Sequence, residues 1–216
     1  MIPRLWYVSD GARASGARPL GAVIAAAARG GAQAVLLRER ALAAREIGAL
    51  CRELAPLRAQ GLRIFASRRL DLALALGLDG VQLTADALPV DEARSWLERG
   101  AKAHLTLGYS AHSLDEAAEV AAQGADYVML SPIFATDSKP GVSPLGLEAL
   151  ARASRALPIP VLALGGLTPA RAADAVRAGA HGVAAASAIG AAPDVERAAH
   201  AFHRSLTEHT ACEPSV

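Results

Sequence analysis

Short apolar runs alternate along this chain with longer stretches in which small apolar and charged residues recur at helical spacing. The runs carry little charge, which is typical of parallel strands that are buried on both faces. The pattern therefore predicts eight strands with helices between them. The expected strands are Arg4–Asp10, Ala34–Arg38, Arg63–Ser67, Gly80–Thr84, His104–Ser110, Tyr127–Ser131, Val161–Gly165 and Gly182–Ser187.

The intervening stretches have small apolar residues on one face and charges on the other, most clearly over Leu42–Leu57 and Leu114–Gln123. Pro89, followed by two acidic residues, suits the first turn of another helix. The last helix is expected from about Val195 to Leu206. The polar residues 207–216 that follow are expected to form a disordered tail.

A repeat decides between the architectures that alternating strands and helices allow. A glycine followed four residues later by valine recurs at Gly31, Gly77, Gly124 and Gly179, at intervals of roughly 50 residues. Each interval is long enough for two strand–helix units, so the four copies of the repeat account for eight units. We therefore predict an α/β fold, a single-domain (β/α)₈ TIM barrel over residues 1–206. An open doubly wound sheet is the alternative.

Composition excludes several classes of protein but does not indicate which reaction this one would catalyse. The 22 Lys and Arg residues nearly balance the 21 Asp and Glu residues, and nothing in that balance indicates a nucleic-acid surface. No apolar run is long enough for a membrane span, and the N-terminus does not resemble a signal peptide. Cys51 and Cys212 are too far apart in the sequence to suggest a disulfide framework or metal site. A cytoplasmic protein is expected.

The run Val161 to Leu164, with Gly165 and Gly166 after it, is the first candidate for chemistry. Glycines allow a ligand to approach the backbone closely. Thr168 and Pro169 then suit a helix start, whose unpaired N–H groups favour a phosphate. An ordinary tight turn is the alternative for this segment.

Most other polar groups fall where the predicted strands end, which in a barrel is the active-site face. Arg38 and Arg40 indicate an anion-binding rim, although either could instead pair with Glu39 or Asp71. The long loop after the sixth strand offers hydroxyls and a cation and is typical of a lid, with a merely solvated loop as the alternative. Its candidate residues are Thr136, Ser138 and Lys139.

His112 is the candidate acid or base, because imidazole exchanges protons near neutral pH. It follows the fifth strand, between Ser110 and Ser113. A structural role at the start of the next helix is the alternative.

Taken together, these segments resemble one family, the barrels of thiamine phosphate synthase and the TenI-like thiazole tautomerase. The similarity extends from Tyr7 to Ile189. It is carried by Leu37-Arg38-Glu39-Arg40, Arg69-Leu70-Asp71-Leu72-Ala73-Leu74, Gly80-Val81-Gln82-Leu83, Ser110-Ala111-His112-Ser113, the Ser131–Gly141 loop, Gly165-Gly166 and Ser187-Ala188-Ile189.

The resemblance implies a substrate that is a phosphorylated thiazole. It implies that the phosphate is held by backbone groups near Gly166 and Ser187, and that the loop hydroxyls and Lys139 contribute further contacts. The substrate-binding residues expected on this basis are Arg38, Arg40, Ser67, Ser110, Thr136, Ser138, Lys139, Gly165, Gly166, Ser187 and Ala188.

Departures from the synthase pattern favour the tautomerase. Where the synthase has a metal-binding aspartate after its third strand, this chain has Arg68. Ala87 stands at the second metal position, with Asp86 one residue earlier, and Leu36 replaces a polar contact. We therefore expect a metal-independent thiazole tautomerase without a cofactor, in which His112 moves the proton.

Two other functions stay open. A divergent thiamine phosphate synthase would join hydroxymethylpyrimidine pyrophosphate to the thiazole phosphate with Mg²⁺ at Asp86. A non-catalytic sensor of thiazole or thiamine phosphate would keep the binding site and lack the chemistry. A homodimer is one expected assembly.

Overall fold

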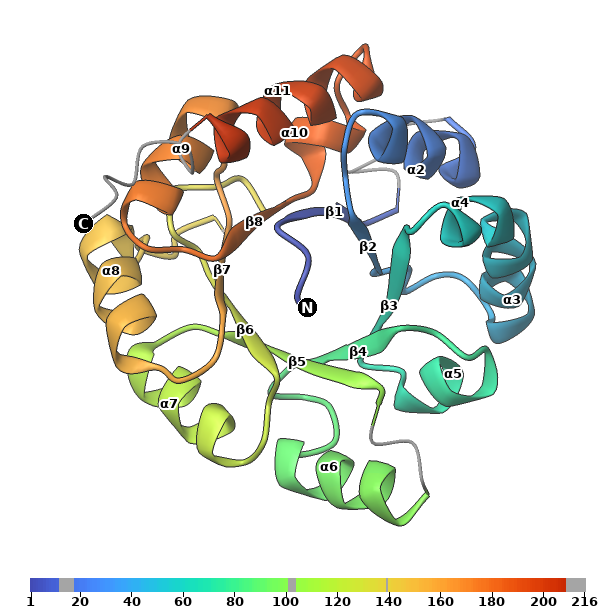
Figure 1. The fold of residues 1–216 in the computed structure, drawn as a ribbon, viewed down its shortest axis with the longest axis horizontal. Helices are drawn as coiled ribbons and strands as arrows, with labels where there is room; N and C mark the ends of the chain where they lie inside the picture. The colour runs from blue at the N-terminus through green and yellow to red at the C-terminus, as the bar shows by residue number, and fades with distance from the viewer. Residues whose placement is uncertain (12–17, 101–103, 139, 209–216) are drawn as a thin grey trace.

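The computed structural model describes residues 1–11, 18–100, 104–138 and 140–208. Its eight parallel strands close into a barrel in sequence order, because β1 pairs with both β2 and β8 (Figure 1). The predicted TIM barrel is confirmed and the open sheet is excluded. The strands are β1 Leu5–Ser9, β2 Ala34–Leu37, β3 Arg63–Ser67, β4 Gly80–Leu83, β5 Thr106–Ala111, β6 Tyr127–Leu130, β7 Val161–Leu164 and β8 Gly182–Ala185.

Helices surround the barrel on its outside (Figure 1). Their small apolar residues pack against the strands, which explains the near-absence of charge in the strand runs. The helices are α2 Leu20–Arg29, α3 Ala44–Glu53, α4 Ala55–Ala59, α5 Leu70–Ala75, α6 Val90–Arg99, α7 Leu114–Ala122, α8 Gly146–Ala156, α9 Pro169–Arg177, α10 Ser187–Gly190 and α11 Val195–Thr207.

The continuous helix expected over Leu42–Leu57 is wrong, because the structure divides this stretch into α3 and α4. Pro56 lies in the first turn of α4. In a continuous helix it would donate no hydrogen bond to the carbonyl of Arg52, and its ring would collide with that carbonyl. The eighth strand is also shorter than expected, because Ser187 already begins α10.

Aromatic side chains fill the inside of the barrel. The Trp6 ring centroid lies 4.3 Å from that of Phe65 and 5.2 Å from that of Tyr127. All three residues are fully buried. Their packing makes the interior a solid core, as in other barrels of this type.

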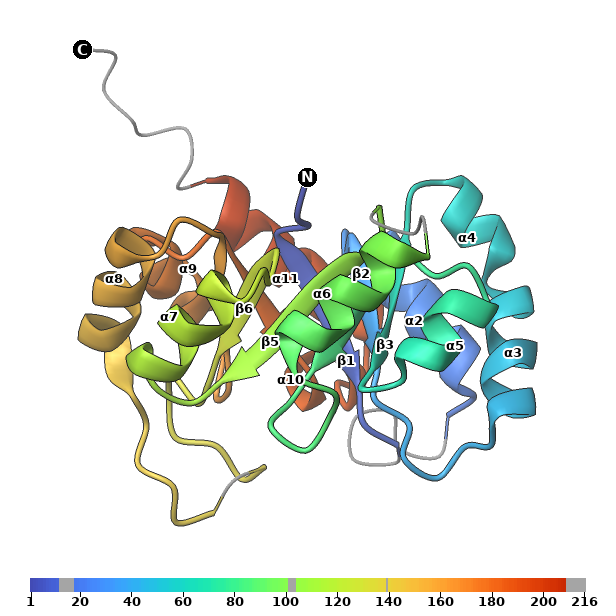
Figure 2. The same cartoon turned by 90° about the horizontal axis from the view of Figure 1, so that it is seen from below.

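The loops that follow the strands gather at one end of the barrel, and the loop after β6 extends furthest (Figure 2). The N-terminus lies at the opposite end (Figure 2). His181 also lies at that end, where its Nε2 atom is 2.8 Å from the carbonyl oxygen of Ile2. Within the described ranges, no helix has the length and apolar character that crossing a bilayer requires. The tail expected after residue 206 lies mostly outside the described residues.

Candidate functional site

A cavity of about 430 Å³ opens where the strands end. Every expected site residue that the structure describes lines it, while Lys139 lies outside the described residues. The structure therefore brings together segments that are far apart in the sequence. The expected residues that line the cavity are Arg38, Arg40, Ser67, Ser110, His112, Thr136, Ser138, Gly165, Gly166, Ser187 and Ala188, together with Asp86.

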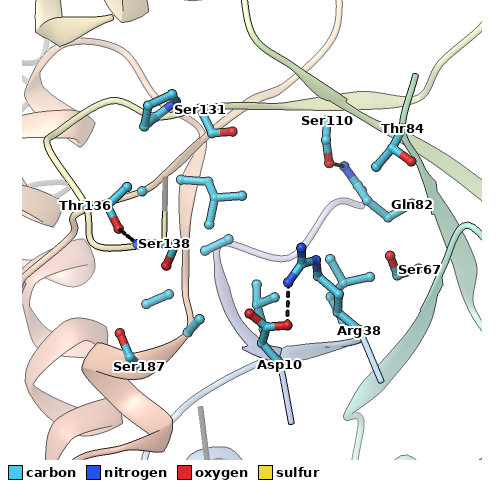
Figure 3. Close-up of a pocket in the computed structure, with 18 of the residues that line it drawn as sticks. Asp10, Arg38, Ser67, Gln82, Thr84, Ser110, Ser131, Thr136, Ser138 and Ser187 are labelled. Atoms are coloured by element: carbon cyan, nitrogen blue, oxygen red, sulfur yellow. Dashed lines mark hydrogen bonds and ion pairs between the residues drawn. The ribbon is translucent and has the colours of Figure 1, made fainter. Parts of the chain in front are cut away.

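The cavity has two chemically different sides (Figure 3). Hydroxyl groups of Thr136, Ser138 and Ser187 lie on one side, near the ends of β6 and β8. Arg38 and Ser67 lie on the other, near the ends of β2 and β3. The two sides therefore differ in the donors that they offer, hydroxyl groups on one side and a guanidinium group on the other.

The glycine pair after β7 is required by packing of the neighbouring loop. Gly165 and Gly166 have φ values of +96° and +64°, which suit glycine far better than other residues. A Cβ atom on Gly166 would lie 2.3 Å from the carbonyl oxygen of Ala135. A Cβ atom on Gly165 would lie 2.9 Å from Pro132. The small residues thus let the loop after β6 approach the end of β7.

The segment expected to bind a phosphate, from Gly165 to the start of α9, lines the cavity only in part. Thr168 does cap this helix, because its Oγ1 atom accepts a hydrogen bond of 3.3 Å from the backbone N–H of Arg171. Thr168 and Pro169 are not among the residues that line the cavity. Gly166, Ser187 and Ala188 do line it.

Arg38 forms an ion pair with Asp10, and this pair lies in the cavity wall (Figure 3). The expected alternative partner Glu39 instead accepts hydrogen bonds of 3.1 and 3.2 Å from the backbone N–H of Gly11. Asp71, the other alternative, pairs with Arg69. The sequence analysis did not identify Asp10 as the partner of Arg38, because the two residues lie 28 positions apart in the chain.

A second ion pair joins Arg68 to Asp86 across the ends of β3 and β4. Asp86 also accepts a hydrogen bond of 2.6 Å from the Thr84 hydroxyl. That hydrogen bond, with the charge of Arg68, holds the pKa of the Asp86 carboxyl below its usual value. Asp86 is therefore an ionised carboxylate at neutral pH, close to a cation.

His112 lines the cavity without capping α7, a role that Ser113 performs. Its Nδ1 atom lies 2.7 Å from the carbonyl oxygen of Ser131. Because a carbonyl can only accept, this contact places a proton on Nδ1. The Glu116 carboxylate accepts hydrogen bonds from the His112 backbone N–H, at 2.7 Å, and from the Tyr109 hydroxyl, at 2.9 Å.

Gln82 is a cavity residue that the sequence analysis did not propose for the site. It is buried in β4, and its Nε2 atom donates a hydrogen bond of 3.0 Å to the Ser110 hydroxyl (Figure 3). A long polar residue within a strand that is otherwise apolar was the available signal. Ser131 and Thr84, which end or follow predicted strands but were not assigned as substrate-binding residues, also line the cavity.

The fold and the cavity define a class: a TIM barrel whose cavity, lined in part by arginines and hydroxyl groups, suits small phosphorylated molecules. The sequence profile of the family described as thiamine monophosphate synthase matches residues 5–189. The chain belongs to this family.

Named relatives agree with this assignment. The thiamine-phosphate synthase of Roseiflexus castenholzii is 43% identical over 198 residues, which cover 91% of this chain and 85% of the relative. A putative thiamine-phosphate synthase of Geobacter sulfurreducens is 39% identical, with 95% of each chain covered. The solved thiamine phosphate pyrophosphorylase of Pyrococcus furiosus superposes with a TM-score of 0.84 at 31% identity, over 95% of this chain and 96% of that one.

These relatives overturn the expectation of a tautomerase. Relatives with about 40% identity over most of the chain are named as synthases, so the isomerase interpretation is wrong. The error came from the weight given to Arg68 and Ala87, which depart from the metal-binding pattern of the synthases.

Proposed function

We propose that this protein is a thiamine phosphate synthase, a transferase that joins hydroxymethylpyrimidine pyrophosphate to a thiazole phosphate and releases pyrophosphate. The observation that carries this proposal is the two-sided cavity, which offers separate places for two phosphorylated substrates. The names of the relatives support the same reaction.

The reaction needs two anions held in a fixed relation. The thiazole phosphate is assigned to the backbone at Gly166 and Ser187 and to the hydroxyls of Thr136 and Ser138. The pyrophosphate is assigned to the opposite side, where Arg38 can bind it through its guanidinium group. The thiazole nitrogen then faces the methylene carbon of the pyrimidine, which lowers the entropic part of the barrier.

Bond formation and cleavage follow from this placement. The thiazole nitrogen forms a bond to the methylene carbon while the bond from that carbon to the pyrophosphate oxygen breaks. The bonding pair leaves with the pyrophosphate. Arg38 and Arg40 stabilise the negative charge that develops on the leaving group. No proton has to move to or from the thiazole, so His112 is assigned as a substrate contact and no longer as the proton carrier.

The donor set suits a magnesium ion that is held together with substrate. No group of three or more His, Cys, Asp or Glu residues that could hold a metal occurs within the described part of the chain. Mg²⁺, however, is often held by one or two carboxylates, several waters and the phosphates of a substrate. Asp86 is an ionised carboxylate at the pyrophosphate side and would hold the ion, which would neutralise part of the pyrophosphate charge.

A coupling assay tests the proposed function. Purified protein is incubated with both substrates and Mg²⁺, and thiamine phosphate and pyrophosphate are quantified. Equal amounts of the two products are expected. The Arg38→Ala variant should lose about 100-fold in kcat/KM, because it removes charge stabilisation of the leaving group. Arg29→Ala is the matched control, because Arg29 pairs with Glu196 on the outside of the barrel.

Absence of thiamine phosphate from the wild-type reaction would refute the proposal. Equal losses in the Arg38 and Arg29 variants would refute the assignment of Arg38. A homodimer and a cytoplasmic location stay predictions, and light scattering of the purified protein tests the first of them.

A further inference from the structure

Arg68 has an unusual backbone conformation for its residue type. Its φ value is +63°, and among the described residues no other non-glycine residue has a positive φ. A hydrogen bond of 2.8 Å from its backbone N–H to the carbonyl oxygen of Gln82 helps to hold this conformation. Glycine would adopt the conformation without strain, and asparagine would tolerate it better than arginine. Because strained backbone conformations cluster at functional sites, the strain at Arg68 points to a role for its side chain.

The side chain of Arg68 contributes to the cavity, while that of its neighbour does not. Arg68 lines the cavity on the side of β3 and β4 and pairs with Asp86. Arg69 forms a similar pair with Asp71, but neither residue of that pair lines the cavity. The chain thus provides two adjacent arginine–aspartate pairs, one within the site and one outside it.

In the Arg68–Asp86 pair, each side chain occupies the other. The guanidinium group would otherwise be available to pyrophosphate, and the carboxylate would be available to a magnesium ion. A guanidinium group binds pyrophosphate oxygens well, since it offers several N–H donors in one plane. A carboxylate is the ligand that a magnesium ion prefers. Both side chains are accessible, with exposed fractions of 34% for Arg68 and 65% for Asp86. Neither group has to leave a buried environment to change its partner.

We propose that Arg68 and Asp86 exchange partners when substrate binds. The Arg68 guanidinium releases Asp86 and binds the pyrophosphate group, and the released Asp86 carboxylate holds the divalent cation that accompanies it. Arg68 is then a pyrophosphate-binding residue, and the ion pair is the resting arrangement of a joint anion and cation site. The identity of the anion rests on the proposed function.

The exchange couples the two ions thermodynamically. A cation on Asp86 frees Arg68 for the anion, and an anion on Arg68 frees Asp86 for the cation. Each ion must therefore strengthen the binding of the other by the same factor. Substitution of one member of the pair should also strengthen binding of the ion that the other member holds, because the ion no longer competes with the substituted side chain.

Isothermal titration calorimetry with inorganic pyrophosphate, without metal and with excess Mg²⁺, tests the exchange. Arg68→Gln should weaken pyrophosphate binding at least tenfold in both conditions. The same substitution should strengthen the binding of Mg²⁺ alone severalfold. Asp86→Asn should strengthen metal-free binding of pyrophosphate severalfold and abolish the gain from Mg²⁺. Arg69→Gln is the matched control and should behave as wild type.

The exchange is refuted if Arg68→Gln binds pyrophosphate as Arg69→Gln does, or if Asp86→Asn weakens metal-free binding. Circular dichroism of each variant establishes that it is folded, and either variant suffices if the other does not fold. The coupling assay tests the proposed function independently of the exchange. Absence of thiamine phosphate with the expected calorimetry would refute only the proposed function. Normal turnover with unchanged pyrophosphate binding by Arg68→Gln would refute only the exchange.

Discussion

Gly166 illustrates how one missing side chain shapes the site. Its backbone conformation is left-handed, and the loop after β6 approaches it so closely that no Cβ atom fits. These are two separate reasons for glycine. Gly77 has a similar φ of +57°, but no atom lies within 4 Å of the position of its Cβ. A comparison of substitutions at the two positions therefore separates the cost of backbone strain from the cost of steric exclusion.

We predict that Gly166→Ala costs about 3 kcal/mol of unfolding free energy, while Gly77→Ala costs about 1 kcal/mol. The difference arises because only the first variant forces the carbonyl of Ala135 to move. Urea denaturation of both variants measures it. Equal losses would mean that the loop yields to the extra methyl group without cost.

Single residues also show how far the sequence could predict the site. Arg38, Ser110 and Ser187 line the cavity as expected, because each ends a predicted strand and strand ends meet in a barrel. Asp10 was missed as a partner of Arg38, since pairing between loops depends on side-chain directions that the sequence does not specify. Arg68 was identified but misinterpreted, because a lost metal ligand does not exclude a metal that the substrate helps to hold.

At the scale of elements, the start of α7 determines where His112 lies. Ser113 caps the helix by accepting a hydrogen bond of 3.1 Å from the backbone N–H of Glu116. The Glu116 carboxylate in turn binds the backbone N–H of His112 and the hydroxyl of Tyr109. This is a variant of the capping box, and it links the end of β5 to the first turn of the helix.

We predict that Glu116→Ala lowers the unfolding free energy by about 2 kcal/mol, because two donors lose a charged acceptor. It should also raise the KM for substrate, since His112 loses its backbone anchor. Glu119→Ala on the exposed face of the same helix is the control, with an expected change below about 0.5 kcal/mol. Thermal denaturation and steady-state kinetics measure the two effects. An unchanged KM would show that Ser131 alone positions His112.

Elements were predicted more reliably than their ends. All eight strands were found, because buried parallel strands leave a strong apolar signal. The helix over Leu42–Leu57 was predicted as one piece, since its apolar periodicity continues past Pro56. Apolar periodicity shows which face of a helix is buried, but it is not affected by a missing backbone N–H. In the sequence, only Pro56 itself indicates the boundary between α3 and α4.

At the scale of the whole molecule, all three tyrosines resist ionisation. Burial raises the pKa of Tyr7 and of Tyr127 well above the usual value. Burial, with the hydrogen bond to Glu116, raises the pKa of Tyr109 to about 12. The chain contains no other tyrosine. The folded protein thus keeps its protons where an unfolded chain, with pKa values near 10, releases them.

We predict that stability falls as pH rises above 10, because the unfolded state then loses protons that the folded state retains. The contribution is fully present below pH 10, and the part due to Tyr109 is lost as pH rises through about 12. Titration of tyrosinate absorbance should show no ionisation of the folded protein at pH 10. Urea denaturation at increasing pH measures the loss, which should be smaller in Tyr109→Phe. A full tyrosine titration near pH 10 without unfolding would contradict this prediction.

The aromatic packing of Trp6, Phe65 and Tyr127 limits the route by which ligands enter and leave the cavity. It fills the interior of the barrel, so ligands cannot pass through the barrel, and the entrance to the cavity lies at the face where the strands end. Both substrates and both products of the proposed reaction have to use that entrance. A molecule bound near the mouth therefore blocks the exit of one bound deeper, and the order in which products leave is set by depth as well as by affinity.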